Sequence, residues 1–177
     1  MPDIPLHASP LMNGNDEYRG LDIQSRKRLL SSFFTMLQHL PIGYEAFAYR
    51  KSECPGGESI APRLKRDIVN QFFENLGYFQ AFDKVKVYYD DGQPVVTKAL
   101  HDAAEYALSA EAVVYRHGSP GDYRLSQAAD LICTFELTAL KFEAGEQTRT
   151  DERFFGMKGA FRKNWLKKVR RKLLQGG

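Results

Sequence analysis

The sequence predicts an α/β fold in which a small sheet is flanked by several helices. The stretches 83–91 and 111–117 have the composition of strands, and the intervening stretch 94–108 has that of a helix. A strand, a helix and a strand with short connections form a βαβ unit, so we expect these two strands to be parallel, with a right-handed crossover. Amphipathic helices on both sides of this unit complete the prediction of a mixed fold.

The first half of the chain should contribute two of these helices and a further strand. The first twenty residues lack periodicity and are expected to be irregular. Apolar residues at helical spacing predict a helix over 21–40, with Asp22 as its N-cap. The stretch 42–51 has strand composition, and a second helix is predicted from about Ala61 to Leu76. Together with the βαβ unit, the stretch 42–51 would make the sheet a mixed one.

A third helix, predicted from near Asp122 to Phe142, contains an acid among apolar residues. Asp130 borders an apolar stripe that consists of Leu125, Ala129, Ile132, Leu137 and Leu140. Asp130 therefore lies either on the solvated face, as we expect for Glu136, or at a cleft or the rim of the core. In the second case it needs a cation, a metal or hydrogen-bond donors, because a buried carboxylate without a partner is costly. Gln127, three residues earlier, is its nearest polar neighbour on the same face.

The C-terminal region predicts an amphipathic basic helix. Phe161, Trp165, Val169 and Leu173 recur every four residues, and Lys and Arg occupy the other faces. Three interpretations remain open: a helix that packs on the body of the protein, a nucleic-acid contact, or a membrane-surface contact. For a nucleic-acid contact, the phosphate-binding side chains would be Arg162, Lys163, Lys167, Arg170 and Arg171.

The amino-acid composition limits the classes of protein to which this chain can belong. The 177 residues have a formal net charge of +3 and two cysteines, Cys54 and Cys133, which indicate neither a disulfide framework nor a metal-ligand spacing. The N-terminus does not resemble a secretion signal, and no apolar run is long enough to span a bilayer. We therefore expect a cytoplasmic protein without a membrane partner. Residues 1–150 should form one domain, with 151–177 as a basic helix packed on it.

Two acids could carry chemistry. Asp90 lies at the end of the predicted strand, directly after VKVYY, and ligand sites in parallel sheets form beyond the carboxyl ends of strands. If the helix that contains Asp130 packs beside this strand, the carboxylates of Asp90 and Asp130 can bind one divalent cation. Mg²⁺ or Mn²⁺ suits an oxygen-only site, and such a metal site would support phosphodiester hydrolysis. Asp91, which precedes a glycine, is expected only to shape the turn.

The stretch GSPGDYRLSQAADLICTFEL resembles the bacterial domain-of-unknown-function 3800 family, as do VKVYYDDGQ before it and PLHASPLM near the start. The Gln-x-x-Asp pair of Gln127 and Asp130 is the more specific part of this resemblance. The resemblance implies a ribonuclease H-like fold and metal-dependent cleavage of nucleic acid. Asp90 and Asp130 would then be catalytic metal ligands, with Gln127 orienting Asp130.

The sequence departs from this family at its N-terminus. Members usually begin with an acidic strand of the type Tyr-Ile-Asp-Glu-Ser-Gly, and the chain starts at about the point that follows it. We therefore expect missing N-terminal strands and an open sheet edge that pairs with a second copy or a partner chain. Three functions remain: a metal-dependent nuclease, inactive if the truncation removes its site; a noncatalytic module that binds DNA or RNA; or a protein-interaction module.

Overall fold

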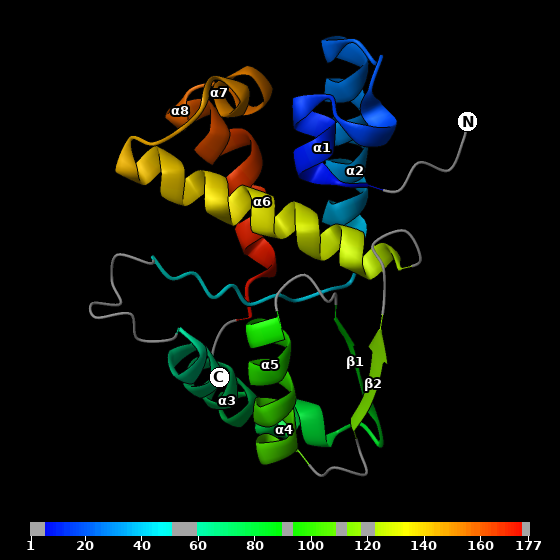
Figure 1. The fold of residues 1–177 in the computed structure, drawn as a ribbon, viewed down its shortest axis with the longest axis vertical. Helices are drawn as coiled ribbons and strands as arrows, with labels where there is room; N and C mark the ends of the chain where they lie inside the picture. Colours follow the sequence, from blue (N-terminus) through cyan, green and yellow to red (C-terminus); the bar gives the residue numbers. More distant parts are fainter. Residues whose placement is uncertain (1–5, 51–59, 90–93, 109–112, 118–122, 175–177) are drawn as a thin grey trace. The chain divides into compact units, whose positions relative to one another are not determined.

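The computed structural model describes residues 6–50, 60–89, 94–108, 113–117 and 123–174. The chain folds into two compact units, of which unit 1 comprises Met1–Ala46 with Pro120–Leu174 and unit 2 comprises Phe47–Ser119. Most of the described residues are helical, and one parallel sheet of two strands makes the protein α/β (Figure 1). The boundaries of the units differ from the boundary at residue 150 that we expected from the sequence.

Unit 1 is helical. It contains α1 (Ala8–Asn13), η1 (Asp16–Tyr18), α2 (Ile23–His39), α6 (Arg124–Ala144) and α7 (Arg149–Phe155). These are followed by four short helical pieces, namely α8 (Lys158–Phe161), the π-helical η5 (Arg162–Leu166), α9 (Lys167–Val169) and η6 (Arg170–Lys172). The four pieces, residues 158–172, are called the C-terminal helical segment below. The predicted helix over 21–40 is confirmed, since Asp22 caps α2 by accepting hydrogen bonds from the backbone of Gln24 and Ser25.

Aromatic side chains from several helices form the centre of unit 1. Phe135 of α6 is fully buried, and its ring centroid lies 5.4 Å from that of Phe34 and 5.5 Å from that of Phe155. The rings of Trp165 and Phe161 lie 5.7 Å and 6.4 Å from it. The core of unit 1 therefore joins residues from the two ends of the described chain.

The apolar stripe predicted for the long helix was wrong. Ile132 is buried, but Leu125, Ala129, Leu137 and Leu140 are exposed. The buried side chains of α6 are Gln127, Ala128, Leu131, Ile132, Phe135, Thr138, Ala139 and Phe142. Because α6 packs on α1 along one side and on η5 along another, the positions of these partners decide which face is buried.

Two other expectations for unit 1 are corrected. Residues 8–18, expected to be irregular, contain α1 and η1. The predicted strand over 42–51 is absent from its described part, in which Tyr44 makes a single parallel bridge to Leu173. The backbone of Tyr44 accepts from Leu174 at 3.0 Å and donates to Lys172 at 2.9 Å. This segment thus meets the end of a helix at Tyr44 and, among the described residues, pairs with no strand.

Unit 2 contains the βαβ unit that the sequence predicted. α3 (Ala61–Glu74) and α4 (Leu76–Gln80) precede β1 (Val85–Tyr89), α5 (Pro94–Ala107) and β2 (Val113–His117). The strands β1 and β2 are parallel, with Val85 opposite Val113 and Tyr89 opposite His117. Within the described residues the sheet has these two strands alone. α3 packs on α5, and Ala104, Leu108 and Val113 form a small core between α5 and the sheet.

Candidate nucleic-acid interface

Asp130 is half-buried on α6, and its carboxylate binds the start of another helix. The Oδ2 atom accepts a hydrogen bond from the backbone N–H of Ala8, the first residue of α1, at 2.7 Å. The N-cap residue of α1, His7, makes no capping bond with its own side chain. Asp130 thus supplies a negative charge and a hydrogen-bond acceptor to the N-terminus of α1. A hydrogen-bond donor is one of the partners that the sequence predicted for this acid if it lay at a cleft or the rim of the core.

The other end of α1 is held by a cation. Arg26 of α2 donates hydrogen bonds to the carbonyls of Leu11 at 3.1 Å and Met12 at 2.7 Å. Gly14, with a φ of 74°, ends the helix in the left-handed region. Opposite charges at its two ends stabilise α1, which is too short to be stable alone.

The metal site predicted from the sequence stays a prediction. Asp90 and Asp91 lie outside the described residues, and Gln127 is buried on α6, 7% exposed. Over the part of the chain that the structure describes, no group of three or more His, Cys, Asp or Glu side chains is arranged to hold a metal ion.

Glu136, expected to be solvated, is held by two partners. Arg170 donates to both carboxylate oxygens, at 3.1 Å to Oε1 and 2.7 Å to Oε2, and the Tyr44 hydroxyl donates to Oε1 at 2.6 Å. Burial alone would raise the pKa of Glu136, but the hydrogen bonds from Arg170 and Tyr44 and the guanidinium charge outweigh it and leave the pKa below its usual value. This cluster attaches the C-terminal helical segment to α6.

The C-terminal helical segment buries its apolar side in unit 1. Phe161, Leu166 and Val169 are at most 5% exposed. Two of its cations have partners in unit 1, because the partly exposed Arg170 pairs with Glu136 and the Lys172 ammonium donates to the carbonyl of Leu40. Arg170, which the sequence placed among the phosphate-binding residues, is therefore better suited to fixing the helix.

Six cations of the C-terminal helical segment face solvent. Besides Arg170, which is exposed but paired with Glu136, the exposed cations are Lys158, Arg162, Lys163, Lys167, Lys168 and Arg171. None of them forms an ion pair with a carboxylate in the described parts of the chain. Lys163, Lys167 and Arg171 follow one another at intervals of four, so they share a side of the helix and repel one another. Residues 158–174 contain no acid that would offset this repulsion.

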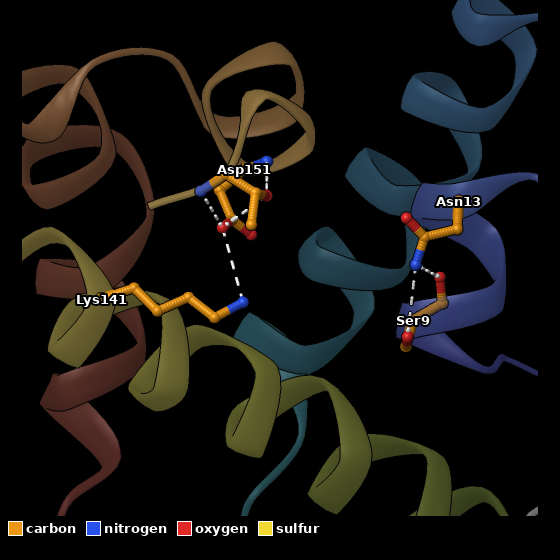
Figure 2. A network of polar contacts seen from close by, with 5 residues as sticks. Ser9, Asn13, Lys141 and Asp151 are labelled. Atoms are coloured by element: carbon orange, nitrogen blue, oxygen red, sulfur yellow. Dashed lines mark hydrogen bonds and ion pairs between the residues drawn. The ribbon is translucent and has the colours of Figure 1, made fainter. Parts of the chain in front are cut away.

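A polar pocket of about 190 Å³ lies among α1, α6 and α7. Figure 2 shows that Lys141 reaches toward Asp151, 3.5 Å away, and that Asn13 donates to Ser9 within α1. Asp151 is 4% exposed and accepts hydrogen bonds from both the backbone and the hydroxyl of Thr148, which completes the capping box of α7. These polar groups satisfy one another, so the pocket serves to join three helices.

No protein-family model, curated protein or solved structure matches the chain. None of the helices, over the residues that the structure describes, is long and apolar enough to cross a membrane. The assignment of the interface therefore rests on the geometry of the chain itself.

Sequence reasoning missed three residues that hold α1 and the C-terminal helical segment in place. Tyr44 and Glu136 fix Arg170, and Arg26 fixes α1, through contacts between residues far apart in the chain. In the sequence Glu136 directly follows Phe135, which is buried in the structure. Many exposed acids also follow an apolar residue, so this position did not identify Glu136.

Proposed function

We propose that this protein binds nucleic acid through the phosphate backbone and that the exposed cations of the C-terminal helical segment form the contact surface. The observation that carries the proposal is the row of Lys163, Lys167 and Arg171, which face solvent and form no ion pair with any carboxylate among the described residues. Clustered cations of this kind bind phosphates and release counterions. The mutual repulsion of the row is relieved when phosphates bind.

The packing of the same helix argues against a membrane surface as the binding partner. An interfacial helix inserts its apolar side among lipid chains. In this protein Phe161, Leu166 and Val169 are instead buried in the core of unit 1, which leaves only the charged side available. A polyanion therefore fits the exposed side better than a bilayer.

Fluorescence anisotropy with labelled duplex DNA and RNA tests the proposal. The triple variant Lys163→Gln/Lys167→Gln/Arg171→Gln should bind more weakly at every salt concentration between about 50 and 200 mM. It should also reduce the slope of log affinity against log salt by about 3, which is roughly one unit per lost phosphate contact.

A matched control variant distinguishes the loss of these phosphate contacts from a general loss of positive charge on the protein. Arg19→Gln/Arg28→Gln/Arg149→Gln removes the same charge from exposed positions elsewhere in unit 1. This control should keep nearly the wild-type slope. Equal slopes for the two triple variants would contradict the assignment of the interface.

A metal-dependent nuclease of ribonuclease H-like fold is the second candidate function, proposed from the family resemblance. One observation favours it: the segment PLHASPLM and the Gln127–Asp130 pair, on which the resemblance rests, are joined by the Ala8–Asp130 hydrogen bond. This bond orients the carboxylate, as hydrogen bonds around metal ligands commonly do. The nuclease would use Asp90 and Asp130 to hold Mg²⁺ or Mn²⁺, with Gln127 as a positioning residue.

Calorimetric titration with Mg²⁺ and Mn²⁺ tests the nuclease proposal. The wild-type chain should bind metal, and Asp90→Asn or Asp130→Asn should abolish the binding. Asp130→Asn keeps an oxygen that can accept from Ala8, so the variant should stay folded. An absence of metal binding by the wild-type chain at millimolar concentrations would exclude this activity for the chain.

A further inference from the structure

The pocket among α1, α6 and α7 is lined mainly by polar side chains. Five of its lining residues carry a hydroxyl group, namely Ser9, Thr134, Thr138, Thr148 and Thr150. Met12 and Leu137 give the pocket an apolar wall. A hydroxyl group both donates and accepts hydrogen bonds, so this lining offers donors and acceptors side by side. The contacts that join the three helices use only some of them.

The hydroxyl of Thr138 is one of the groups that these contacts leave unused. Thr138 is 1% exposed, and its hydroxyl has no hydrogen-bond partner among the described residues. The hydroxyls of Thr134 and Thr150, which line the same pocket, also have none there. Because a buried hydroxyl without a partner is costly, most such groups in native proteins are hydrogen-bonded. A polar ligand in the pocket would provide the partner for Thr138.

The ion pair in the pocket also has donors and an acceptor to spare. Oδ2 of Asp151 accepts from the N–H and the hydroxyl of Thr148, both at 2.8 Å, and the Lys141 ammonium lies 3.5 Å from the same oxygen (Figure 2). Oδ1 of Asp151 and two of the three N–H groups of Lys141 form no hydrogen bond with a described residue. These groups are therefore available to a ligand.

We propose that this pocket binds a neutral polyhydroxylated molecule, either a single sugar ring or a cyclic polyol of the same size. Its hydroxyl groups accept from Lys141 and Thr138 and donate to Asp151. Its C–H groups pack on Met12 and Leu137. The volume of about 190 Å³ is below the roughly 300 to 1,000 Å³ of sites for drug-sized ligands, which suits a molecule of this size.

The charges of the lining favour a neutral ligand over a small anion. Lys141 and Asp151 are the charged residues of the lining, and their formal charges cancel. An anion bound to the Lys141 ammonium would lie close to the Asp151 carboxylate, which is 4% exposed and repels it with little screening by solvent. A hydroxyl group meets no such repulsion, because it can accept from Lys141 and donate to Asp151 at the same time.

Ligand-observed nuclear magnetic resonance and thermal unfolding of the full chain test the site, with glucose, galactose, mannose and myo-inositol as neutral probes and inorganic phosphate as the anion. At least one neutral probe should bind with a Kd of about 1 mM or below and raise the unfolding temperature. Phosphate should not compete with it. If none of the neutral probes binds at about 10 mM, the proposal is overturned.

Thr138→Val removes the buried hydroxyl and keeps the shape of the side chain. It should weaken the affinity for the bound probe about tenfold. Because the hydroxyl has no partner among the described residues, the variant without probe should unfold at the wild-type temperature or above it. Thr35→Val, at an exposed threonine of α2 outside the pocket, is the matched control and should bind the probe like the wild type.

Lys141→Met gives a second measurement in case Thr138→Val does not fold. It removes the ammonium, leaves Asp151 its bonds from Thr148, and should abolish probe binding. Unchanged probe affinity in both variants would place the binding elsewhere and overturn the site. Phosphate that binds the wild type but not Lys141→Met, with the neutral probes unbound, would make the pocket an anion site and contradict the proposal.

The sugar site and the proposed nucleic-acid surface can fail separately. The residues that line the pocket lie outside the C-terminal helical segment. The triple variant of that segment should therefore bind the probe like the wild type, and none of the probe measurements uses nucleic acid. Loss of probe binding in the triple variant would contradict the assignment to this pocket.

Discussion

The carboxylate of Asp130 accepts its hydrogen bond from the amide of Ala8, 122 residues away in the chain. A carboxylate that receives a backbone N–H at a helix start gains both a hydrogen bond and a favourable interaction with the helix dipole. At the scale of one residue, Asp130 therefore has a structural role whether or not it also binds metal.

Replacement of Asp130 should measure this role. Asp130→Ala leaves the Ala8 N–H without its acceptor and should lower the free energy of unfolding by about 1 to 2 kcal/mol. Asp130→Asn keeps an acceptor and should cost less. Urea unfolding followed by circular dichroism gives both values, and equal losses in the two variants would show that the hydrogen bond contributes little.

Glu136 should make the free energy of unfolding depend on pH. Since its pKa is lower in the folded state than its usual value of 4.5, its contribution is present above that value and is lost as the pH falls through the folded pKa. Glu136→Gln should cost about 1 kcal/mol at neutral pH, a modest figure because the Arg170 side chain is 41% exposed.

Unfolding of Glu136→Gln and wild type at neutral pH and below pH 4.5 checks this expectation. The two stabilities should converge as the solution is acidified, since protonation removes the charge that the variant lacks. A constant difference between them would contradict the role of the ion pair.

The sequence left open whether Asp130 is solvated or needs a partner, and it could not show which partner that would be. The neighbours Ala128, Ala129 and Leu131 indicate an apolar context, but the donor is a main-chain amide, which every sequence position except proline offers. The same limit applied to Glu136, whose partners Tyr44 and Arg170 come from distant segments. Asp90 lies outside the described residues, so its pairing with Asp130 remains a prediction.

At the scale of elements, α1 depends on contacts at both of its ends. A helix of six residues is unstable in isolation, and this one is held by Asp130 at its start and Arg26 at its end. The glycine that ends it, Gly14, is close to Arg26, since a Cβ there would lie 3.1 Å from Nη1.

Two glycines with the same backbone conformation offer a matched comparison. Gly14 and Gly145 end α1 and α6 with φ values of 74° and 72°. Gly145→Ala should cost about 1 kcal/mol for the left-handed backbone alone. Gly14→Ala should cost more, because the methyl group also displaces the Arg26 guanidinium. Thermal unfolding ranks the two variants, and a smaller loss at Gly14 would contradict the role given to Arg26.

Patterns among neighbouring residues predicted those helices and strands whose formation depends mainly on neighbouring residues. Asp22 and the periodicity after it located α2, and the strand composition of 83–91 located β1. The predicted strand over 42–51 is wrong for its described part, 42–50. A segment with strand composition forms a strand only where a neighbouring strand is available to pair with it, and the composition alone does not show this. The buried face of α6 was predicted wrongly because α6 packs on both α1 and η5, and the two partners together decide which side chains are buried.

At the scale of the whole molecule, the two units differ in the size of their cores. Among the residues that the structure describes, twenty buried residues form the core cluster of unit 1, whereas the two clusters of unit 2 contain four and three. Two strands alone form a marginal sheet. Unit 2 should therefore open locally at a lower free energy than unit 1.

Hydrogen exchange on the full chain measures this difference. Amides of β1 and β2 should exchange faster than those in the middle of α6. Protection of β1 and β2 equal to that of α6 in the free protein would show that unit 2 is more stable than its core suggests.

The core of unit 1 is assembled from two stretches of chain with all of unit 2 between them. During synthesis on the ribosome, Phe34 and Leu37 of α2 emerge long before Phe135, Leu166 and Val169, the side chains that will cover them. The main stretch of unit 2, residues 47–119, is complete before the second stretch of unit 1 has been made, so it can fold first. The apolar side of α2 stays uncovered until that second stretch arrives, and a chain in this state is prone to aggregation.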